Sequence, residues 1–207
     1  MCIRDSTTLS PIDIEAAIKQ AIEDFNDEQL IDFNTQLQLS RLETAINAAD
    51  PSIQTNTTEL TLRKAFRAVV LQTTSPTVTF RNEIVPGTIV SSDFVSAGGK
   101  YQYTDYNPNL PTITVTVNNG RTTITNSTDT VYLKDITDPA TISYSPAGAV
   151  DYATGTIRMT SIVLTSLEGS DGILFYAKPL LQDVTAREND VLSIDVESGI
   201  TVTVRKS

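Results

Sequence analysis

The spacing of hydrophobic residues changes near Asn56, from a helical repeat to strict alternation. In residues 10–25 apolar side chains recur every three or four positions, which predicts a helix with one buried face: Ile14, Ala17, Ile18, Ala21, Ile22 and Phe25. Ser10 is a suitable N-cap, Pro11 suits the first helical position, and Asp13 completes a capping-box-like arrangement. A second helix is predicted over residues 40–49, ended by Asp50 and Pro51.

Beyond Asn56, threonine and β-branched residues dominate and the repeat shortens to two residues, which is typical of β-strands. Alternation is clearest over residues 112–117. After this segment, Asn119 and Gly120 predict a type I′ turn that leads into a strand at 122–125. Further strands are predicted at 59–67, 77–84, 88–94, 130–134, 140–144, 156–164, 173–177, 191–195 and 200–204.

The segment 150–157, VDYATGTI, is the most informative local pattern in the β-rich part. It predicts a strand ending near Tyr152, a tight turn in which Gly155 takes a positive φ, and a second strand from Thr156. Turn residues that separate predicted strands, such as those at 146–148, indicate an antiparallel β-meander or sandwich-like region. Together with the short N-terminal helices, this predicts an α+β fold that is mainly β.

The Gly98–Gly99 pair is the most natural domain boundary. We therefore expect an α+β region at 10–98 and a β-rich antiparallel domain at 99–207, after a disordered tail at 1–9. Residues 1–6, MCIRDS, resemble translated sequencing-adapter sequence and are expected not to be native. The alternation at 200–204 continues almost to the last residue, so we expect the chain to be a fragment of a longer protein.

Composition excludes several kinds of function. The 207 residues hold 15 basic and 25 acidic side chains, a net charge of -10, which disfavours nucleic-acid binding. The densest basic cluster, Arg63, Lys64 and Arg67, fits a solvated face. No apolar run is long enough for a membrane span, so no membrane partner is expected. With no histidine and one cysteine, Cys2, imidazole bases, thiolate nucleophiles and His or Cys metal sites have no basis.

We predict no catalytic, cofactor-binding or metal-binding residues. Asp151 beside Tyr152 is interpreted as a turn carboxylate, with Tyr152 packing across strands. Glu168, Ser170 and Asp171 lack the ligand spacing of a calcium loop and indicate a hairpin loop. The glycosylation-like positions Asn56 and Asn126 are interpreted as ordinary turn residues.

A group of three tyrosines, Tyr101, Tyr103 and Tyr106, lies near Lys100 and Asp105. These tyrosines either form a sugar-binding or protein-contact surface or pack in the core and across strands, and the second interpretation is favoured.

Four segments, taken in order, carry a resemblance to a known family: 40–64, 89–94 (IVSSDF), 148–157 (GAVDYATGTI) and 189–204. A helix ends at Asp50 and is followed by a turn and a strand, and Gly148 later leads into the tyrosine-containing hairpin with its Thr154–Gly155 turn. In this order the segments resemble the large wedge subunit of contractile-tailed phage baseplates, a family related to the baseplate J-like proteins. Its members are several times longer than this chain.

The resemblance implies a structural virion protein that pairs with itself, as a homo-oligomer or ring, and with other baseplate wedge proteins. It implies no catalysis and no cofactor, and a location in the tail baseplate after assembly in the host cytoplasm. Two alternatives stay open. The first is a β-sandwich adhesion module that binds a host-surface glycan or protein through Tyr101, Tyr103 and Tyr106, and the second is an acid-pair glycoside hydrolase.

Overall fold

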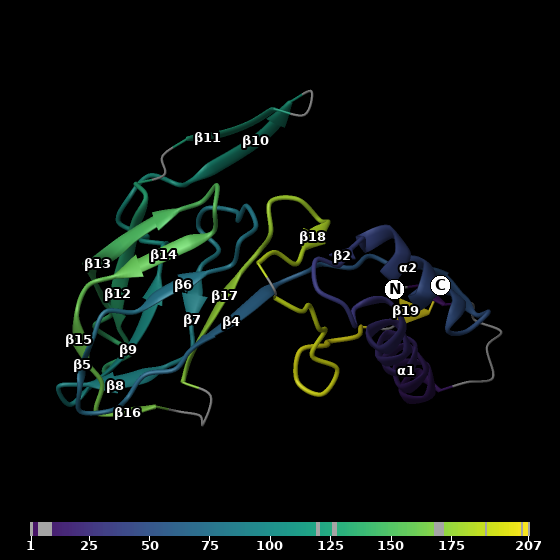
Figure 1. Ribbon diagram of the computed structural model, residues 1–207, viewed down its shortest axis with the longest axis horizontal. Coiled ribbons are helices and arrows are strands. Elements are labelled where there is room, and N and C mark those ends of the chain that lie inside the picture. The colour runs from purple at the N-terminus through teal and green to yellow at the C-terminus, as the bar shows by residue number, and fades with distance from the viewer. Residues whose placement is uncertain are drawn as a thin grey trace. The chain divides into compact units, whose positions relative to one another are not determined.

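The computed structural model describes residues 2–3, 10–118, 121–125, 128–167, 172–188, 190–203 and 205–206, and divides the chain into two compact units (Figure 1). Unit 1 comprises Met1–Glu59 and Gln182–Ser207, and unit 2 comprises Leu60–Leu181. Unit 2 is therefore inserted into the chain of unit 1.

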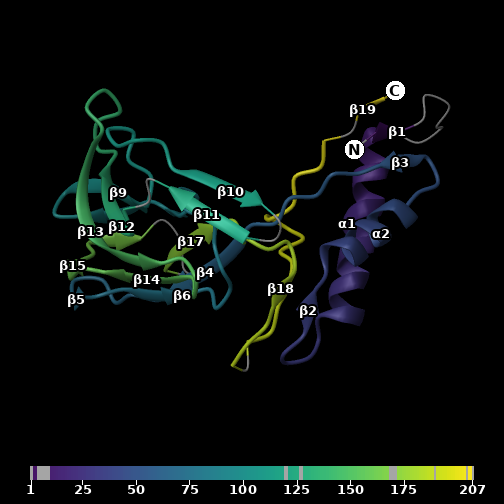
Figure 2. The same ribbon diagram turned by 90° about the horizontal axis from the view of Figure 1, so that it is seen from above.

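Two helices form the main part of unit 1, and they confirm both helix predictions. Helix α1 (Pro11–Gln29) begins with a complete capping box, in which Ser10 and the third helical residue, Asp13, hydrogen-bond to each other's backbone amides. Helix α2 (Leu39–Ala48) packs beside α1 (Figure 2). The buried stripes of the two helices are Ile14, Ile18, Ile22 and Phe25 on α1, and Leu39, Leu42 and Ile46 on α2.

The strands of unit 1 join its two separate chain segments. β2 (Gln36–Leu37) pairs with β18 (Val184–Thr185), and β1 (Cys2–Ile3) pairs with both β3 (Ile53–Thr55) and β19 (Arg205–Lys206). β1 lies within the tail that we expected to be disordered.

Unit 2 is built on one antiparallel sheet whose main order is β4 (Leu62–Phe66), β17 (Ile173–Ala177), β7 (Val90–Ser91), β9 (Gly99–Thr104), β12 (Thr130–Asp135), β13 (Ser143–Asp151), β14 (Thr156–Met159) and β6 (Thr77–Thr79). Off this order, β8 (Phe94–Ser96) pairs with β9 and with β16 (Ser166–Leu167). The two end strands, β4 and β6, also contact each other, so the sheet curls almost into a barrel. These strands and helices confirm an α+β, mainly β fold.

Two small sheets complete unit 2. β5 (Thr73–Thr74) pairs with β15 (Ile162–Val163), and β10 (Thr114–Asn118) pairs with β11 (Arg121–Thr125). The predicted turn at Asn119 and Gly120 lies outside the described residues.

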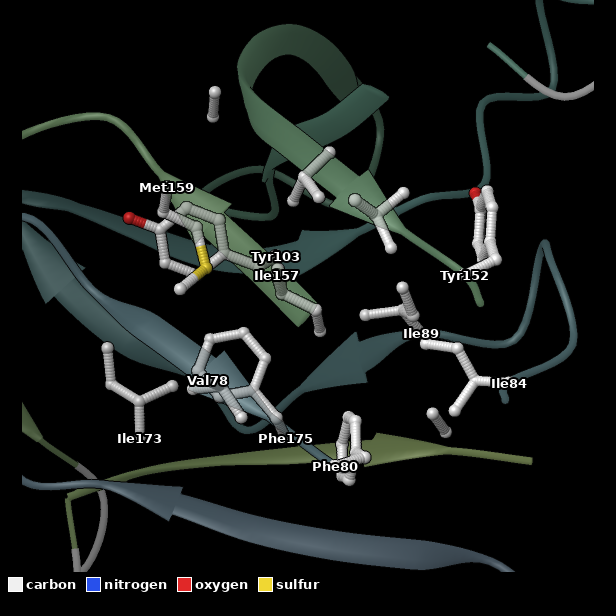
Figure 3. Packing of buried hydrophobic residues seen from close by; sticks show 14 of the residues in the cluster. Val78, Phe80, Ile84, Ile89, Tyr103, Tyr152, Ile157, Met159, Ile173 and Phe175 are labelled. Atoms are coloured by element: carbon white, nitrogen blue, oxygen red, sulfur yellow. The ribbon is translucent and has the colours of Figure 1, made fainter. Parts of the chain in front are cut away.

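The interior of unit 2 is a single hydrophobic cluster (Figure 3). Tyr103 belongs to this cluster, with its ring centroid 5.0 Å from that of Phe94 and 5.8 Å from that of Phe175. Ile157 and Ile173, both fully buried, fill the space around these rings. The inward face of the curled sheet therefore supplies the core.

The VDYATGTI segment forms the hairpin that its sequence predicts. β13 ends at Asp151 and β14 begins at Thr156, and Gly155 has φ +64°. A Cβ atom on Gly155 would lie 2.4 Å from the carbonyl oxygen of Asn82, so the turn has room only for glycine.

Some strand predictions were wrong. The break expected at 146–148 is absent, because β13 runs through Pro146 with a bulge, where Val131 pairs with Gly148 and Tyr132 pairs with Pro146. The predicted strands at 191–195 and 200–204 are not found in their described residues, which carry alternation but pair with no neighbouring strand.

The structure also divides the chain at different places from the predicted boundary. Gly98 and Gly99 lie inside unit 2, at the tight turn between β8 and β9, where Gly98 has φ +84°. Gly98 suits this turn because a positive φ is unfavourable for residues that carry a Cβ atom. The glycine pair therefore belongs to a hairpin of unit 2.

Candidate functional site

A buried carboxylate, that of Asp105, is the main polar feature of the interior of unit 2. Asp105 follows directly after β9 and is 3% exposed. Its Oδ2 accepts hydrogen bonds from the backbone amide of Gly87 at 2.6 Å and from the Tyr152 hydroxyl at 3.1 Å. Its Oδ1 accepts a hydrogen bond from the amide of Ile89 at 2.9 Å. Asp105 therefore ties three separate stretches of unit 2 together.

Burial raises the pKa of Asp105, and the hydrogen bonds from Gly87, Ile89 and Tyr152 act in the opposite direction. Each carboxylate oxygen already accepts from the surrounding protein, so the group is held in place as a structural acceptor. From the sequence, Asp105 was noted only as a neighbour of the tyrosines, and its role as a buried acceptor was not predicted. The available signal was an acidic residue immediately after an alternating strand.

The hollow beside Asp105 is too small for a substrate. It has space for about one water molecule. The residues that line it are Asp105, Tyr106, Asn107, Leu110, Pro111, Ile113 and Thr128. Within the described parts of the chain, no group of three or more Asp, Glu, His or Cys side chains is arranged to hold a metal ion.

The three tyrosines proposed as a binding surface do not share an exposed face. Tyr103 is 1% exposed in the core, Tyr101 is half-buried against the same core, and Tyr106 is 51% exposed. The favoured interpretation of core packing is thus confirmed for Tyr101 and Tyr103. A glycan platform needs aromatic faces open to solvent, and Tyr103 cannot supply one.

The remaining polar candidates have local structural roles. Asp151 accepts hydrogen bonds from the amide of Ala153 and from both the amide and the hydroxyl of Thr154, and the Thr154 hydroxyl is the main cause of its lowered pKa. Asp151 is therefore the turn carboxylate that we predicted. The Asn56 amide donates to the Glu43 carbonyl and to the Asn47 side chain within unit 1.

Several predicted positions lie outside the described residues: Glu168, Ser170, Asp171 and Asn126. The basic cluster falls on and just after β4, where Arg63 and Arg67 are exposed and Lys64 is partly buried. This alternation fits the solvated face that we expected for the cluster.

Exposed apolar side chains form two candidate contact surfaces, one on each unit. On unit 1, Ile31 and Phe33 are 64% and 61% exposed in the loop between α1 and β2. On unit 2, Val69, Val70 and Leu71 are exposed in sequence between β4 and β5. Leu71 adopts φ +63°, an unfavourable conformation for leucine, and its amide donates to the Leu164 carbonyl at 2.7 Å. Large exposed apolar groups of this kind are typical of protein contact sites.

The C-terminal segment completes unit 1 through specific polar contacts. The Asn26 side chain donates to the Ile194 carbonyl at 2.8 Å and accepts from the Ile194 amide at 2.9 Å. Asp183 accepts a hydrogen bond from the amide of Leu39 at the start of α2, at 3.2 Å. The helical unit is thus closed by residues that lie far away in the sequence.

Residues 4–65 match the family model for baseplate structural protein gp6, C-terminal domain III. The matched segment contains α1, β2, α2 and β3 of unit 1, together with the loop that carries Ile31 and Phe33, and it ends within β4. A comparison with curated proteins finds no match.

The match supports a structural role in a phage tail baseplate, and with it a location in the virion tail. It implies assembly with other baseplate proteins. Among the described residues, no helix has both the length and the apolar character needed to cross a membrane.

Proposed function

We propose that this chain is part of a baseplate wedge subunit of a contractile-tailed phage, related to the baseplate J-like proteins. It associates with copies of itself and with other wedge proteins, and it is assembled into the tail in the host cytoplasm. It acts through protein contacts, without catalysis, cofactor, nucleic acid or membrane. The observation that carries the proposal is the match of residues 4–65 to a baseplate structural domain.

The geometry of unit 1 supports this role. The matched segment supplies both helices of unit 1 and leaves Ile31 and Phe33 in solvent at 64% and 61% exposure. Leu30, next to them in sequence, is 2% exposed, so the loop is anchored and its two apolar side chains are presented at a fixed place. Burying such side chains against a partner yields about 1.5–3 kcal/mol each.

The polar groups of unit 2 support contact rather than chemistry. Asp105, the buried acid, has both oxygens engaged by Gly87, Ile89 and Tyr152. The neighbouring hollow has space for about one water molecule, whereas ligand pockets usually measure about 300–1,000 Å³.

The test is incorporation into virions. A phage that encodes a tagged chain is purified, and quantitative mass spectrometry with chemical cross-linking measures the amount of the chain and its neighbours. The double variant Ile31→Ser, Phe33→Ser should enter virions less than the wild type because its partner contact loses apolar area. Leu181→Ser is the matched control, since Leu181 is also 64% exposed but lies outside the matched segment.

Cross-links between the wild-type chain and other baseplate subunits are the expected result. Absence of the wild-type chain from purified virions contradicts the proposed function. Equal incorporation of the double variant and the Leu181→Ser control contradicts only the role of the loop.

A further inference from the structure

The two-stranded sheet of β10 and β11, which we call the arm, stands apart from the main sheet of unit 2 (Figure 1). Among the described strands, β10 and β11 pair only with each other. A hairpin of two strands is at best marginally stable in water when it stands alone, and it exposes two outer edges. The arm therefore has the geometry of an element that is completed by another strand.

The main sheet does not offer comparable edges. Its two end strands, β4 and β6, contact each other, so the curled sheet covers its own ends. This contact between β4 and β6 crowds the edges at which a foreign strand would add. The other two-stranded sheet of unit 2, β5 with β15, has only two residues in each strand, so the five-residue strands of the arm offer the longer edges.

Within the arm, β10 also lacks the charged residues and prolines with which proteins protect exposed edges. β10 reads Thr-Val-Thr-Val-Asn and contains no charged residue and no proline. In the chain as a whole the net charge is -10, yet residues 106–128 contain no aspartate or glutamate and a single arginine, Arg121. Two copies of the chain repel each other least where their acid-free segments meet.

The sequence of β10 is complementary to itself. If a second copy of β10 lies antiparallel to the first with Thr116 opposite Thr116, then Val115 lies opposite Val117 and Thr114 lies opposite Asn118. Valine thus meets valine and threonine meets threonine, which are favourable cross-strand pairs. β11 lacks this symmetry, because centring it on Thr123 places Thr122 opposite Ile124 and Arg121 opposite Thr125.

We propose that β10 pairs antiparallel with β10 of a second copy of this chain, about a two-fold axis at Thr116, to form a four-stranded sheet from two arms. Thr116 is exposed and Val115 is half-buried in the single chain, so both are accessible to the second copy. The contact is isologous, as expected for a homodimer. This pairing specifies the self-association in the proposed function and rests on it for its place in a baseplate.

The first test is cross-linking at the two-fold axis. Facing residues of antiparallel strands have Cα atoms about 4.5–5.5 Å apart, which is within the range that a disulfide spans. In a Cys2→Ser background, Thr116→Cys should form a covalent dimer under mild oxidation. Thr141→Cys, an exposed threonine in the loop between β12 and β13, should stay monomeric.

The second test uses charge. Thr116→Lys and Thr116→Glu each place like charges opposite each other at the axis, so each variant alone should associate about fivefold more weakly than the wild type. An equimolar mixture of the two should recover dimers, because lysine then faces glutamate. Analytical ultracentrifugation measures both effects, and an unchanged circular dichroism spectrum shows that the variants are folded.

Three results overturn the pairing: a wild-type chain that is monomeric at high micromolar concentration, no difference in cross-linking between Thr116→Cys and Thr141→Cys, or a charge mixture that associates no better than its components. The virion experiment is a separate readout. A monomeric chain that enters virions overturns the pairing and leaves the proposed function standing. A Thr116-dependent dimer that is absent from virions supports the pairing and overturns the proposed function.

Discussion

The two units of this chain are held together in different ways. Unit 2 is one continuous segment, Leu60–Leu181, around an aromatic and aliphatic core that contains Tyr103. Unit 1 is made of two segments at opposite ends of the sequence, joined by β2 with β18 and by the contacts of Asn26 with Ile194. Unit 2 is therefore formed by one continuous stretch of the chain, whereas unit 1 is completed only when the chain returns after residue 181.

The stability of each unit can be measured separately because each unit has its own spectroscopic signal. All 7 tyrosines, at positions 101, 103, 106, 132, 144, 152 and 176, lie in unit 2. Both helices of the described residues lie in unit 1. Tyrosine fluorescence therefore reports unfolding of unit 2, and the helical circular dichroism signal reports unfolding of unit 1.

The largest effect is expected from Phe175→Ala in the core of unit 2. Phe175 is fully buried and its ring stacks on Tyr103, so its truncation should lower the free energy of unfolding by about 3–5 kcal/mol. Denaturant titration should show an earlier tyrosine transition and an unchanged helical one. A helical transition that moves by the same amount would mean that the two units unfold together.

A smaller effect is expected from Asp105→Asn, which replaces the buried carboxylate acceptor in unit 2. An amide has one oxygen in place of two, so at least one donor among Gly87, Ile89 and Tyr152 loses its partner. We expect the tyrosine transition to lose about 1–3 kcal/mol at neutral pH. Asp151→Asn, at an exposed turn carboxylate in the same unit, is the control and should have a smaller effect.

The raised pKa of Asp105 also predicts the direction in which the stability of unit 2 changes with pH. Its pKa is raised in the folded state, so between the unfolded and folded pKa values the folded chain binds more protons than the unfolded chain. Its contribution therefore makes unit 2 less stable as the pH rises from about 4, the ordinary value for aspartate, through the raised pKa. The stability difference between wild type and Asp105→Asn should accordingly be larger at low pH than at neutral pH. A difference that grows with rising pH contradicts this sign.

The smallest effect is expected from Asn26→Ala, which removes both hydrogen bonds to Ile194. The loss should be about 1 kcal/mol for each bond, seen in the helical signal alone, because the bonds join the two segments of unit 1. Gln20→Ala, on the same helix, removes only a hydrogen bond to Asp24 that is exposed to solvent, and it should change stability less. Equal effects from the two variants would show that the return segment does not support unit 1.

Sequence patterns predicted the parts of the fold that short-range rules determine. The start of α1 follows from Ser10, Pro11 and Asp13, and the β13–β14 hairpin follows from Gly155, because each feature depends on neighbouring residues. Strand 173–177 was predicted with its exact bounds, and in the structure its positions alternate between buried and half-buried.

Long-range pairing was not predictable from the same patterns. Residues 191–195 alternate as a strand would, but strand formation also requires a partner, and that segment instead uses Ile194 to bind Asn26. Residues 146–148 were interpreted as a turn that separates strands, whereas the bulge in β13 accommodates Pro146 within the strand. The role of Asp105 depends on donors from loop 85–89 and from Tyr152, which only the folded sheet brings together.

The pairing of β4 with β17 has a consequence for how such a chain evolves. Leu62 lies opposite Ala177, so the polypeptide enters and leaves the inserted unit at adjacent positions. A unit attached at adjacent ends is exchangeable by recombination, since a replacement needs only two neighbouring termini to rejoin the host chain. Another domain whose own ends lie close together could therefore take the place of unit 2 while both segments of unit 1 stay unchanged.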